Sequence, residues 1–339
     1  MAEAAAESPD QSTAALAVTG HDEPLARLAA AINRGRLAST YLFVGPDGVG
    51  KRRVALRLAA ALFCPHAGPR SVDPCGRCES CRRVARGAHP DVLRVAKPEG
   101  KSGLPIDLFV GPADKRNRVG LCHDLALRPM LADRRVAIIE DADDFTVESA
   151  NCLLKTLEEP PPRSLIILIG TSVARQLPTI RSRSQVVRFG PLPEADVARL
   201  ASATDAEIED APAAAAEARG SVARALRLAD PACRAARDAV RRQLATPRLD
   251  AVSLAKTLEA ESKAAGTEPR VRRALMHELL DAAIGVYHER LRGLPAGENP
   301  DRTLAALDAC VEAAESLDRN ANQSTLVQWL AERLAAAGR

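Results

Sequence analysis

Four closely spaced cysteines are the clearest chemical feature of this sequence. Three of them are separated by two residues each and the fourth lies upstream: Cys64, Cys75, Cys78 and Cys81. Four thiolates complete a tetrahedral Zn²⁺ site and leave no position for water or substrate. We therefore predict a structural zinc module over residues 64–81, in which the metal stabilises an excursion too small to have a core of its own.

Other chemistry for these cysteines is less well supported. An iron–sulfur cluster would use the same four thiolates, but no Cys-Pro pair follows the run. A redox pair of cysteines is the weakest alternative. The nearby His66 and His89 are candidate metal ligands, yet four sulfur atoms already complete the coordination. Zinc held by the four cysteines is the preferred interpretation.

A glycine-rich stretch shortly before the first of these cysteines has the spacing of a phosphate-binding loop. It follows the apolar run 41–44 and precedes a helical pattern, a context in which backbone N–H groups cradle phosphate. Its residues are Gly45, Gly48, Gly50, Lys51 and Arg52. Arg52 occupies the position at which a Ser or Thr hydroxyl would bind Mg²⁺. We expect weak or absent nucleotide binding.

An acidic pair follows a second apolar run. Residues 136–139 end in Glu140 and Asp141, where nucleotide-hydrolysing proteins place the carboxylates that hold the metal and orient water. Their order is the reverse of the usual one and moves each carboxylate by one methylene, a shift that can cost about a hundredfold in rate. We therefore expect very poor hydrolysis, and the plainer alternative is that the two acids merely end a strand.

Strands and helices that alternate along the chain must position these groups. Helices are predicted over residues 25–32, 54–63 and 147–158, and strands over residues 41–44, 91–96, 136–139 and 165–169. Such alternation argues for a parallel sheet covered by helices. After residue 193 strand-like runs vanish, and two stripes predict a bundle of amphipathic helices: Leu304, Leu307, Val311, Ala314 and Leu317, and then Leu326, Leu330 and Leu334.

The charge and aromatic content do not identify a partner. A net charge of +3 and an aromatic content of 2% are too low to predict nucleic-acid affinity or a base-stacking surface for the chain by itself. Residues 1–20 have no periodicity and no signal-peptide pattern, so we expect a flexible tail and a cytoplasmic protein. The remaining cysteines are expected to be buried and reduced: Cys122, Cys152, Cys233 and Cys310.

Several stretches resemble one known family, the AAA+ clamp loaders of bacterial DNA replication. Residues 151–161 resemble that family's helix after the second acidic motif, and residues 177–184 are similar to its Ser-Arg-Cys element, with Ser184 in place of Cys. The zinc cysteines and residues 89–91 match as well. The resemblance runs from about residue 21 to the C-terminus, and residues 320–322, before the final helix, are similar to the C-terminal collar of these subunits.

The resemblance implies an architecture of three domains. It implies an α/β AAA+ P-loop domain with the inserted zinc knuckle over residues 21–193, a small helical lid over residues 194–232 and an all-α helical collar over residues 233–339. Within the lid, residues 220–226 resemble the motif that carries a sensor arginine in ATP-hydrolysing relatives, and Ala223 occupies that arginine's position.

The resemblance also implies a role. In this family the arginine that matches Arg183 reaches the ATP of a neighbouring subunit. Because Arg52, the reversed acids and Ala223 each weaken hydrolysis within the chain, the pattern resembles the delta-prime subunits of DNA polymerase III. It implies a stator in a hetero-pentamer with tau/gamma and delta subunits, which loads a sliding clamp on primed DNA.

Two other functions stay open on sequence alone. The presence of Gly45, Gly50 and Lys51 is compatible with a tau/gamma-like motor that hydrolyses ATP itself, and nucleotide binding to the isolated chain would separate it from the stator. A zinc-dependent nucleic-acid-binding module would show salt-sensitive DNA affinity. Four basic residues near the motifs are candidates for phosphate contacts: Lys155, Arg163, Arg181 and Arg188.

Overall fold

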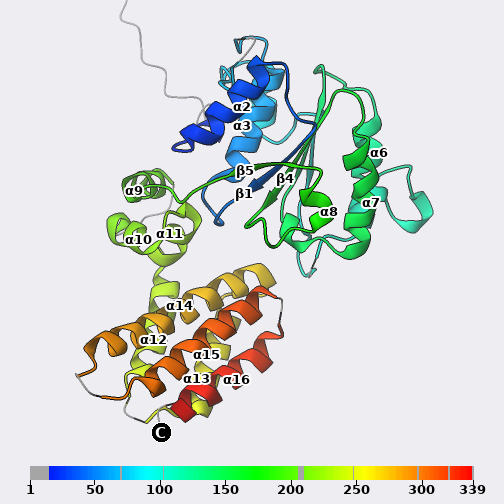
Figure 1. Cartoon of the computed structure of the whole chain (residues 1–339). Coiled ribbons are helices and arrows are strands. Elements are labelled where there is room, and N and C mark those ends of the chain that lie inside the picture. The colour runs from blue at the N-terminus through cyan, green and yellow to red at the C-terminus, as the bar shows by residue number, and fades with distance from the viewer. Residues whose placement is uncertain are drawn as a thin grey trace, which may run out of the picture. The chain divides into compact units, whose positions relative to one another are not determined.

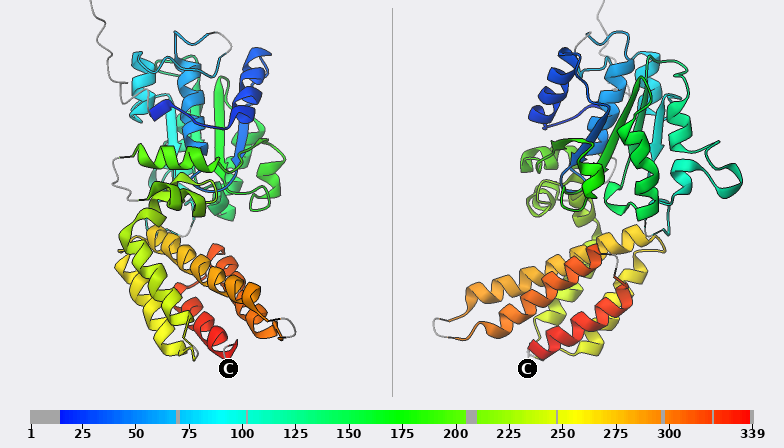
Figure 2. Two further views of the ribbon diagram at one scale, coloured as in Figure 1. Left: turned by 90° about the vertical axis from the view of Figure 1, so that its left-hand side faces the viewer. Right: turned by 45° about the vertical axis from the view of Figure 1, so that its right-hand side comes forward.

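The chain forms two compact units, which meet along the sequence at residues 205/206, 214/215 and 224/225. The computed structural model describes residues 15–68, 71–101, 103–204, 210–246, 248–295, 298–319 and 321–337. Figures 1 and 2 show an α/β unit that contains the sheet and a second, helical unit. The expected division into three domains stays a prediction, and the expected boundary at residue 232/233 falls inside one continuous helix, α12 (Pro231–Leu244).

The first unit is built on a five-stranded parallel sheet in the order β2-β3-β4-β1-β5. The strands are β1 (Thr40–Val44), β2 (Val92–Val95), β3 (Arg135–Ile139), β4 (Ser164–Gly170) and β5 (Gln185–Arg188). Nearly every residue of β1, β3 and β4 is buried, which explains their continuous apolar runs. The predicted α/β class and parallel sheet are confirmed.

Alternate residues of the central strands enter two separate apolar clusters, because successive side chains of a strand point to opposite faces. Phe43 and Ile138 lie in the cluster that includes α2, α3 and α4, whereas Leu42 and Ile139 lie in the cluster that includes α5, α6, α7 and α8. Helices therefore cover both faces (Figure 1). Their bounds are α2 (Asp22–Asn33), α3 (Lys51–Phe63), α4 (Glu79–Ala85), α5 (Asp107–Val110), α6 (Leu121–Ala126), α7 (Val147–Glu158) and α8 (Pro178–Arg181).

The remaining chain is helical, as predicted. Three short helices follow the sheet, α9 (Glu194–Ser202), α10 (Ala211–Glu217) and α11 (Val222–Ala229). The second unit contains α12 and a bundle of α13 (Ala251–Ala264), α14 (Pro269–Gly293), α15 (Asp301–Asp318) and α16 (Gln323–Ala337), which share one apolar cluster. Among the helices that the structure describes, none is both long and apolar enough to cross a membrane.

One of the two predicted stripes is only partly correct, because Leu307, Ala314 and Leu317 face the core but the other two residues do not. Leu326, Leu330 and Leu334 of α16 are buried as expected, but Leu304 and Val311 of α15 are exposed by 39% and 44%. The buried face of α15 consists instead of small residues and one leucine: Ala306, Ala309, Cys310, Ala313 and Leu317. Small side chains let α15 pack closely against neighbouring helices, and Leu304 and Val311 lie outside this buried face.

Two further expectations need correction. Residues 1–14 lie outside the described part of the chain, but Leu16 is buried in the core, so the segment before residue 21 is not a flexible tail throughout. Cys233 and Cys310 are buried as predicted, whereas Cys122 and Cys152 are only partly buried. Leu16 is one leucine among alanines, and no periodicity marks it as a core residue.

Candidate functional site

The four predicted metal ligands come together in the first unit. The sulfur atoms of Cys64, Cys75, Cys78 and Cys81 all lie within 4.8 Å of one another. Cys64 follows the last residue of α3, and Cys78 is the N-cap of α4. This arrangement could hold one metal ion. Neither His66, which is exposed, nor His89, which is buried, belongs to the group.

Backbone amides within the module are directed at the cysteine sulfur atoms. The N–H groups of Cys75, Cys78 and Cys81 donate to the Sγ atoms of Cys64, Cys75 and Cys78 at 3.5, 3.4 and 3.5 Å. Burial raises the pKa of the Cys75 thiol, but hydrogen bonds from the Arg77 and Cys78 amides and the neighbouring thiols bring it down to about 6. Donors of this kind favour the thiolate, which is the form that binds a metal.

Arg57 of α3 attaches the module to the rest of the unit. Its guanidinium donates to the carbonyl oxygens of Val72 and Leu16 at 3.2 and 3.3 Å and forms an ion pair with Asp73. Phe63 stacks on His89, with ring centroids 4.5 Å apart. The excursion is therefore held by α3 as well as by its cysteines.

The glycine-rich loop connects β1 to α3, as the phosphate-loop pattern predicts. Gly48 and Gly50 have φ values of 74° and 106°, in the left-handed region that favours glycine. The Lys51 Nζ atom donates to the carbonyl oxygens of Gly45 and Pro46, both at 2.6 Å. Burial lowers the pKa of Lys51, and the charges of Asp47 and Asp143 oppose this effect. The ammonium group is thus bonded to the loop itself.

The residues around the start of α11 pack against this loop. The Val222 N–H donates to the Gly48 carbonyl oxygen at 3.2 Å. A Cβ atom on Gly48 would lie 2.4 Å from Ser221 Oγ and 2.6 Å from Ala223 Cβ, so no larger residue fits at Gly48. Ala223, the residue that matches the family's sensor arginine, therefore places a methyl group against the loop.

The first acid after β3 is paired with two arginines. Glu140 Oε1 lies 3.3 Å from Arg52 Nε of α3 and 2.9 Å from Arg94 Nη2 of β2, and the Glu140 side chain is 16% exposed. The predicted phosphate-loop and acidic residues are therefore adjacent in space. The guanidinium group of Arg52 joins them by its ion pair with Glu140.

The following acids also bond to protein groups. Asp141, with a φ of 55°, accepts a hydrogen bond from the Lys97 N–H at 3.1 Å. Asp143 accepts from the Thr171 N–H at 2.7 Å and from the Gln176 amide. Asp144 pairs with the ammonium group of Lys97. Each carboxylate in residues 140–144 therefore has a partner within the chain.

Arg183 lies between α8 and β5. Its guanidinium donates to Glu158 Oε1 of α7 at 2.5 Å, to the Thr179 carbonyl oxygen at 3.0 Å and to Ser182 Oγ at 3.1 Å. The Arg183 side chain is 34% exposed. The four candidate phosphate-binding residues are also exposed, but they are spread over α7, a loop, α8 and β5: Lys155, Arg163, Arg181 and Arg188.

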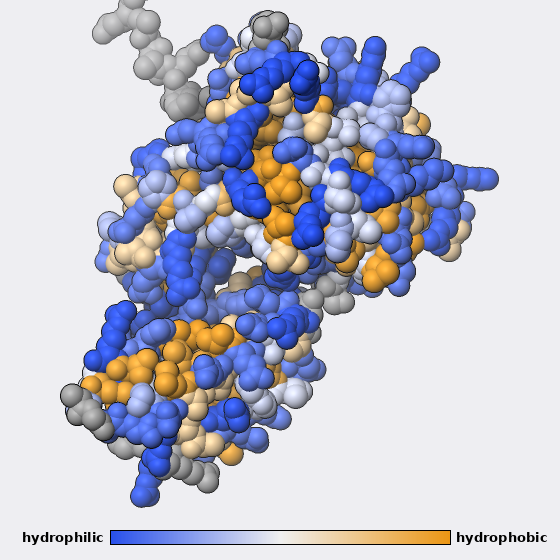
Figure 3. Space-filling view, viewed as in Figure 1, coloured by the Kyte–Doolittle hydropathy of each residue, from blue (hydrophilic) through white to orange (hydrophobic). Residues whose placement is uncertain are grey.

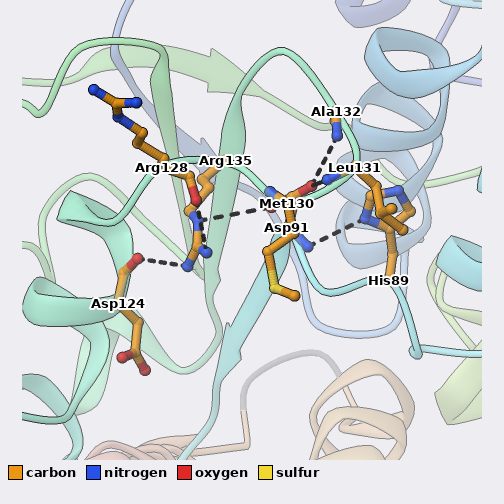
Figure 4. Close-up of polar contacts among 8 residues, drawn as sticks. All are labelled: His89, Asp91, Asp124, Arg128, Met130, Leu131, Ala132 and Arg135. Carbon is orange, nitrogen blue, oxygen red and sulfur yellow. Dashed lines mark hydrogen bonds and ion pairs between the residues drawn. The ribbon is translucent and has the colours of Figure 1, made fainter.

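Asp91, in the stretch 89–91, organises a buried network (Figure 4). Its carboxylate is fully buried and accepts hydrogen bonds from the backbone N–H groups of Met130, Leu131 and Ala132 at 2.7, 2.7 and 2.9 Å. The Nε atom of Arg135 lies 3.7 Å from Asp91 Oδ1. Although burial alone would raise the pKa of Asp91, the three amide hydrogen bonds hold it below its usual value. Asp91 therefore fixes the loop before β3.

Sequence reasoning did not assign a role to Arg94, Lys97, Glu158 or Asp91. Arg94 lies opposite Ile138 in the parallel register of β2 and β3, which brings it near Glu140 only once the strand order is known. Glu158 lies in a stretch that resembles the family pattern, but its pairing with Arg183 depends on how α7 and α8 pack. The one local signal is that Arg94 is the only charged residue of the strand-like run 92–95.

The sequence is similar to subunits of DNA polymerase III. A family model described as "DNA polymerase III, delta subunit" matches residues 20–193, half of the chain. DNA polymerase III subunit delta′ of Pseudomonas aeruginosa is 37% identical over 162 residues, which cover 48% of this chain and 46% of the relative. The Bacillus subtilis delta′ subunit is 36% identical over 161 residues, or 48% and 45% of the two chains.

A gamma/tau subunit is similar over a longer stretch of this chain. DNA polymerase III subunit gamma/tau of Mycobacterium bovis is 34% identical over 198 residues, which cover 57% of this chain and 32% of the relative. The chain spans about half the length of the delta′ relatives it matches. On the match over residues 20–193, the chain belongs to the family described as DNA polymerase III, delta subunit.

Proposed function

We propose that this chain is a delta-prime subunit of a bacterial clamp loader. It serves as a stator in a hetero-pentamer with tau/gamma and delta subunits, and it completes the ATP site of a neighbour while the assembly places a sliding clamp on primed DNA. The delta′ relatives at 36–37% identity support this assignment. The chain acts in the cytoplasm.

One observation carries the proposal: the groups that would handle a nucleotide in this chain have partners within the chain, and the Arg183 side chain, although paired as well, is 34% exposed. Lys51 donates to loop carbonyls and Glu140 pairs with Arg52. Arg183 makes its ion pair with Glu158, a side chain that is itself 49% exposed. An exposed arginine can exchange such a partner for the phosphates of a neighbour's ATP.

In this role Arg183 is an arginine finger. It stabilises the charge that develops on the transferred phosphoryl group, a contribution worth about 10³–10⁵-fold in rate in well-studied cases. The chain supplies this group without hydrolysing ATP itself. ATP binds weakly or not at all in its own loop.

The four-cysteine cluster holds a structural zinc ion. A set of four thiolates with amide donors directed at sulfur suits Zn²⁺ and closes its coordination shell. Iron would bind the same donors, so metal analysis of the purified chain tests the assignment. Zinc is expected at one equivalent per chain.

The proposed role is tested by the steady-state ATPase activity of the reconstituted loader with clamp and primed DNA. Arg183→Ala is expected to slow turnover strongly, because one site loses its arginine finger. Lys51→Ala is expected to leave turnover unchanged. Arg175→Ala, which removes an exposed arginine from the loop before α8, is the matched control, and assembly of each variant is checked by mass.

The alternative function, an ATP-hydrolysing motor, predicts the opposite effects of the two variants on turnover. If Lys51→Ala abolishes turnover and Arg183→Ala does not, the chain is a tau/gamma-like motor. The glycines of the loop and the 34% identity to a gamma/tau subunit are the observations that favour this alternative.

A further inference from the structure

Phosphate-loop proteins use a divalent cation between two elements of the fold. The hydroxyl after the loop lysine and an acid at the end of a neighbouring strand hold Mg²⁺, which in turn contacts the nucleotide phosphates. In this chain the corresponding residues are Arg52 and Glu140. If the chain bound Mg²⁺ as these proteins do, Arg52 and Glu140 would have to supply its ligands.

The donor set does not fit Mg²⁺. That ion requires oxygen ligands in near-ideal octahedral geometry, and Arg52 offers only N–H donors. Glu140 Oε1 is already shared between Arg52 Nε at 3.3 Å and Arg94 Nη2 at 2.9 Å. A metal at this position would have to displace two guanidinium groups and then lie beside their charges.

The other nearby carboxylates do not replace the missing ligands. Asp141 and Asp144 are both engaged by Lys97, through its backbone N–H and its ammonium group. Asp143 accepts hydrogen bonds from Thr171 and Gln176. Rearrangement at Glu140 alone would therefore free only one carboxylate, and a Mg²⁺ ion bound to it would lie beside the charges of Arg52 and Arg94.

We infer that Arg52 replaces the divalent cation in this chain. Its guanidinium joins the end of the phosphate loop to the end of β3, as a metal ion does in other proteins of this type. Because an arginine side chain is always protonated in proteins, the positive charge at this position does not depend on nucleotide or metal. Any nucleotide that enters the loop is therefore bound without Mg²⁺.

The geometry also assigns a role to Arg94. It approaches Glu140 from the neighbouring strand, and the Glu140 side chain is only 16% exposed. The two arginines face one partly buried carboxylate, so these three side chains together carry an excess of positive charge. This excess repels Mg²⁺ and attracts an anion, so the preference for metal-free polyphosphate follows from the charge of the cluster.

The test measures ATP binding to the full-length, zinc-loaded chain by isothermal titration calorimetry, with Mg²⁺ or with EDTA. Magnesium is expected to weaken any ATP binding or leave it within about twofold, since Mg²⁺ neutralises part of the charge that the arginines attract. Absence of ATP binding in both conditions would overturn the expected preference for metal-free polyphosphate. ATP binding that Mg²⁺ strengthens tenfold or more would overturn it.

A pair of variants tests the residue assignment. In Arg52→Thr, the ratio of ATP affinity with Mg²⁺ to that with EDTA is expected to rise at least fivefold, or metal-dependent binding to appear where there was none. Arg53→Thr, which removes an exposed arginine from the next position of α3, is expected to keep the wild-type ratio. An unchanged ratio in folded Arg52→Thr would overturn the assignment. If that variant does not fold, the wild-type comparison still decides.

This experiment needs no other subunit. A chain that bound Mg–ATP could still act as a stator through Arg183, and a chain without metal could fail as a stator. The two measurements therefore separate failure of the metal inference from failure of the proposed function.

Discussion

The carboxylate of Asp91 shows how one buried charge can determine the course of a loop. It accepts three backbone hydrogen bonds and lies near Arg135, whose guanidinium donates to the carbonyl oxygens of Asp124 and Arg128 at 2.6 and 3.0 Å (Figure 4). A carboxylate can accept from every one of these amides, whereas a neutral amide side chain has one oxygen acceptor and would turn its NH₂ group toward a donor.

We therefore predict that Asp91→Asn lowers the free energy of unfolding by about 2–3 kcal/mol, because hydrogen bonds to a charged acceptor are lost and a buried donor is left unpaired. Chemical denaturation of the α/β unit measures the loss. Asp133→Asn changes an exposed acid of the same loop and is expected to have an effect below about 0.5 kcal/mol. Equal losses in the two variants would contradict this account.

The pH dependence of Asp91 has a definite sign. Because the folded-state pKa lies below the unfolded value of about 4, the unfolded state binds the proton more readily. The stabilisation is complete above the unfolded pKa and is lost as the pH falls through the folded pKa. The stability difference between wild type and Asp91→Asn should therefore shrink below about pH 4.

Single residues differ in how far the sequence predicts their place. The four cysteines could be grouped in advance because a metal requires them to converge, whatever the path of the chain between them. The pairing of Glu140 with Arg52 and Arg94 could not be predicted, since it depends on α3, β2 and β3 meeting at one end of the sheet. Long-range ion pairs leave no periodic trace in a sequence.

At the scale of elements, the cysteine module replaces a core with a few directed bonds. Cys81 is fully buried and Cys64 nearly so, but the excursion between α3 and α4 contributes few other large apolar side chains. In such a segment the bound metal supplies much of the folding free energy.

Loss of the metal should therefore have a large effect on structure that is confined to this segment. We predict that Cys81→Ser removes bound zinc, measured by elemental analysis, and exposes residues 71–85 to rapid amide hydrogen exchange. Cys122→Ser, a change at a partly buried cysteine outside the module, should retain both zinc and protection. Retention of a full equivalent of zinc by Cys81→Ser would show that the metal is bound elsewhere.

Elements also differ in predictability. The helix expected over residues 147–158 has the bounds of α7, since Thr146 caps it through a reciprocal bond with Ser149 and the prolines at residues 160–162 follow its end. Strand β5 was not predicted. It has only two apolar residues, Val186 and Val187, and it exists because β1 offers a free edge for parallel pairing.

At the scale of the whole molecule, the second unit presents hydrophobic residues on its surface (Figure 3). Leu304 and Val311 lie two turns apart on α15 and therefore share one face of that helix. The buried residues of the same helix are three alanines, Cys310 and Leu317. The two large side chains thus contribute little to the fold of the chain itself, and they are available to pack against another subunit.

Changes on the exposed and the buried face of α15 should therefore affect the fold differently. The double change Leu304→Glu and Val311→Glu should alter the unfolding free energy of the isolated chain by no more than about 1 kcal/mol, because both positions are exposed. Ala313→Glu, on the buried face, should unfold the helical unit, because it buries an unpaired charge. Circular dichroism of the three chains checks both expectations.

In the reconstituted loader the exposed pair should matter for a different reason. If α15 packs against another subunit of the proposed pentamer, the double glutamate chain should remain folded and yet be lost from the complex on size-exclusion chromatography with mass detection. Asp308→Asn, which removes an exposed acid from the same helix, is the control for altered surface charge. Full incorporation of the double variant would mean that this face of α15 stays in solvent and that the bundle uses another face to join its neighbours.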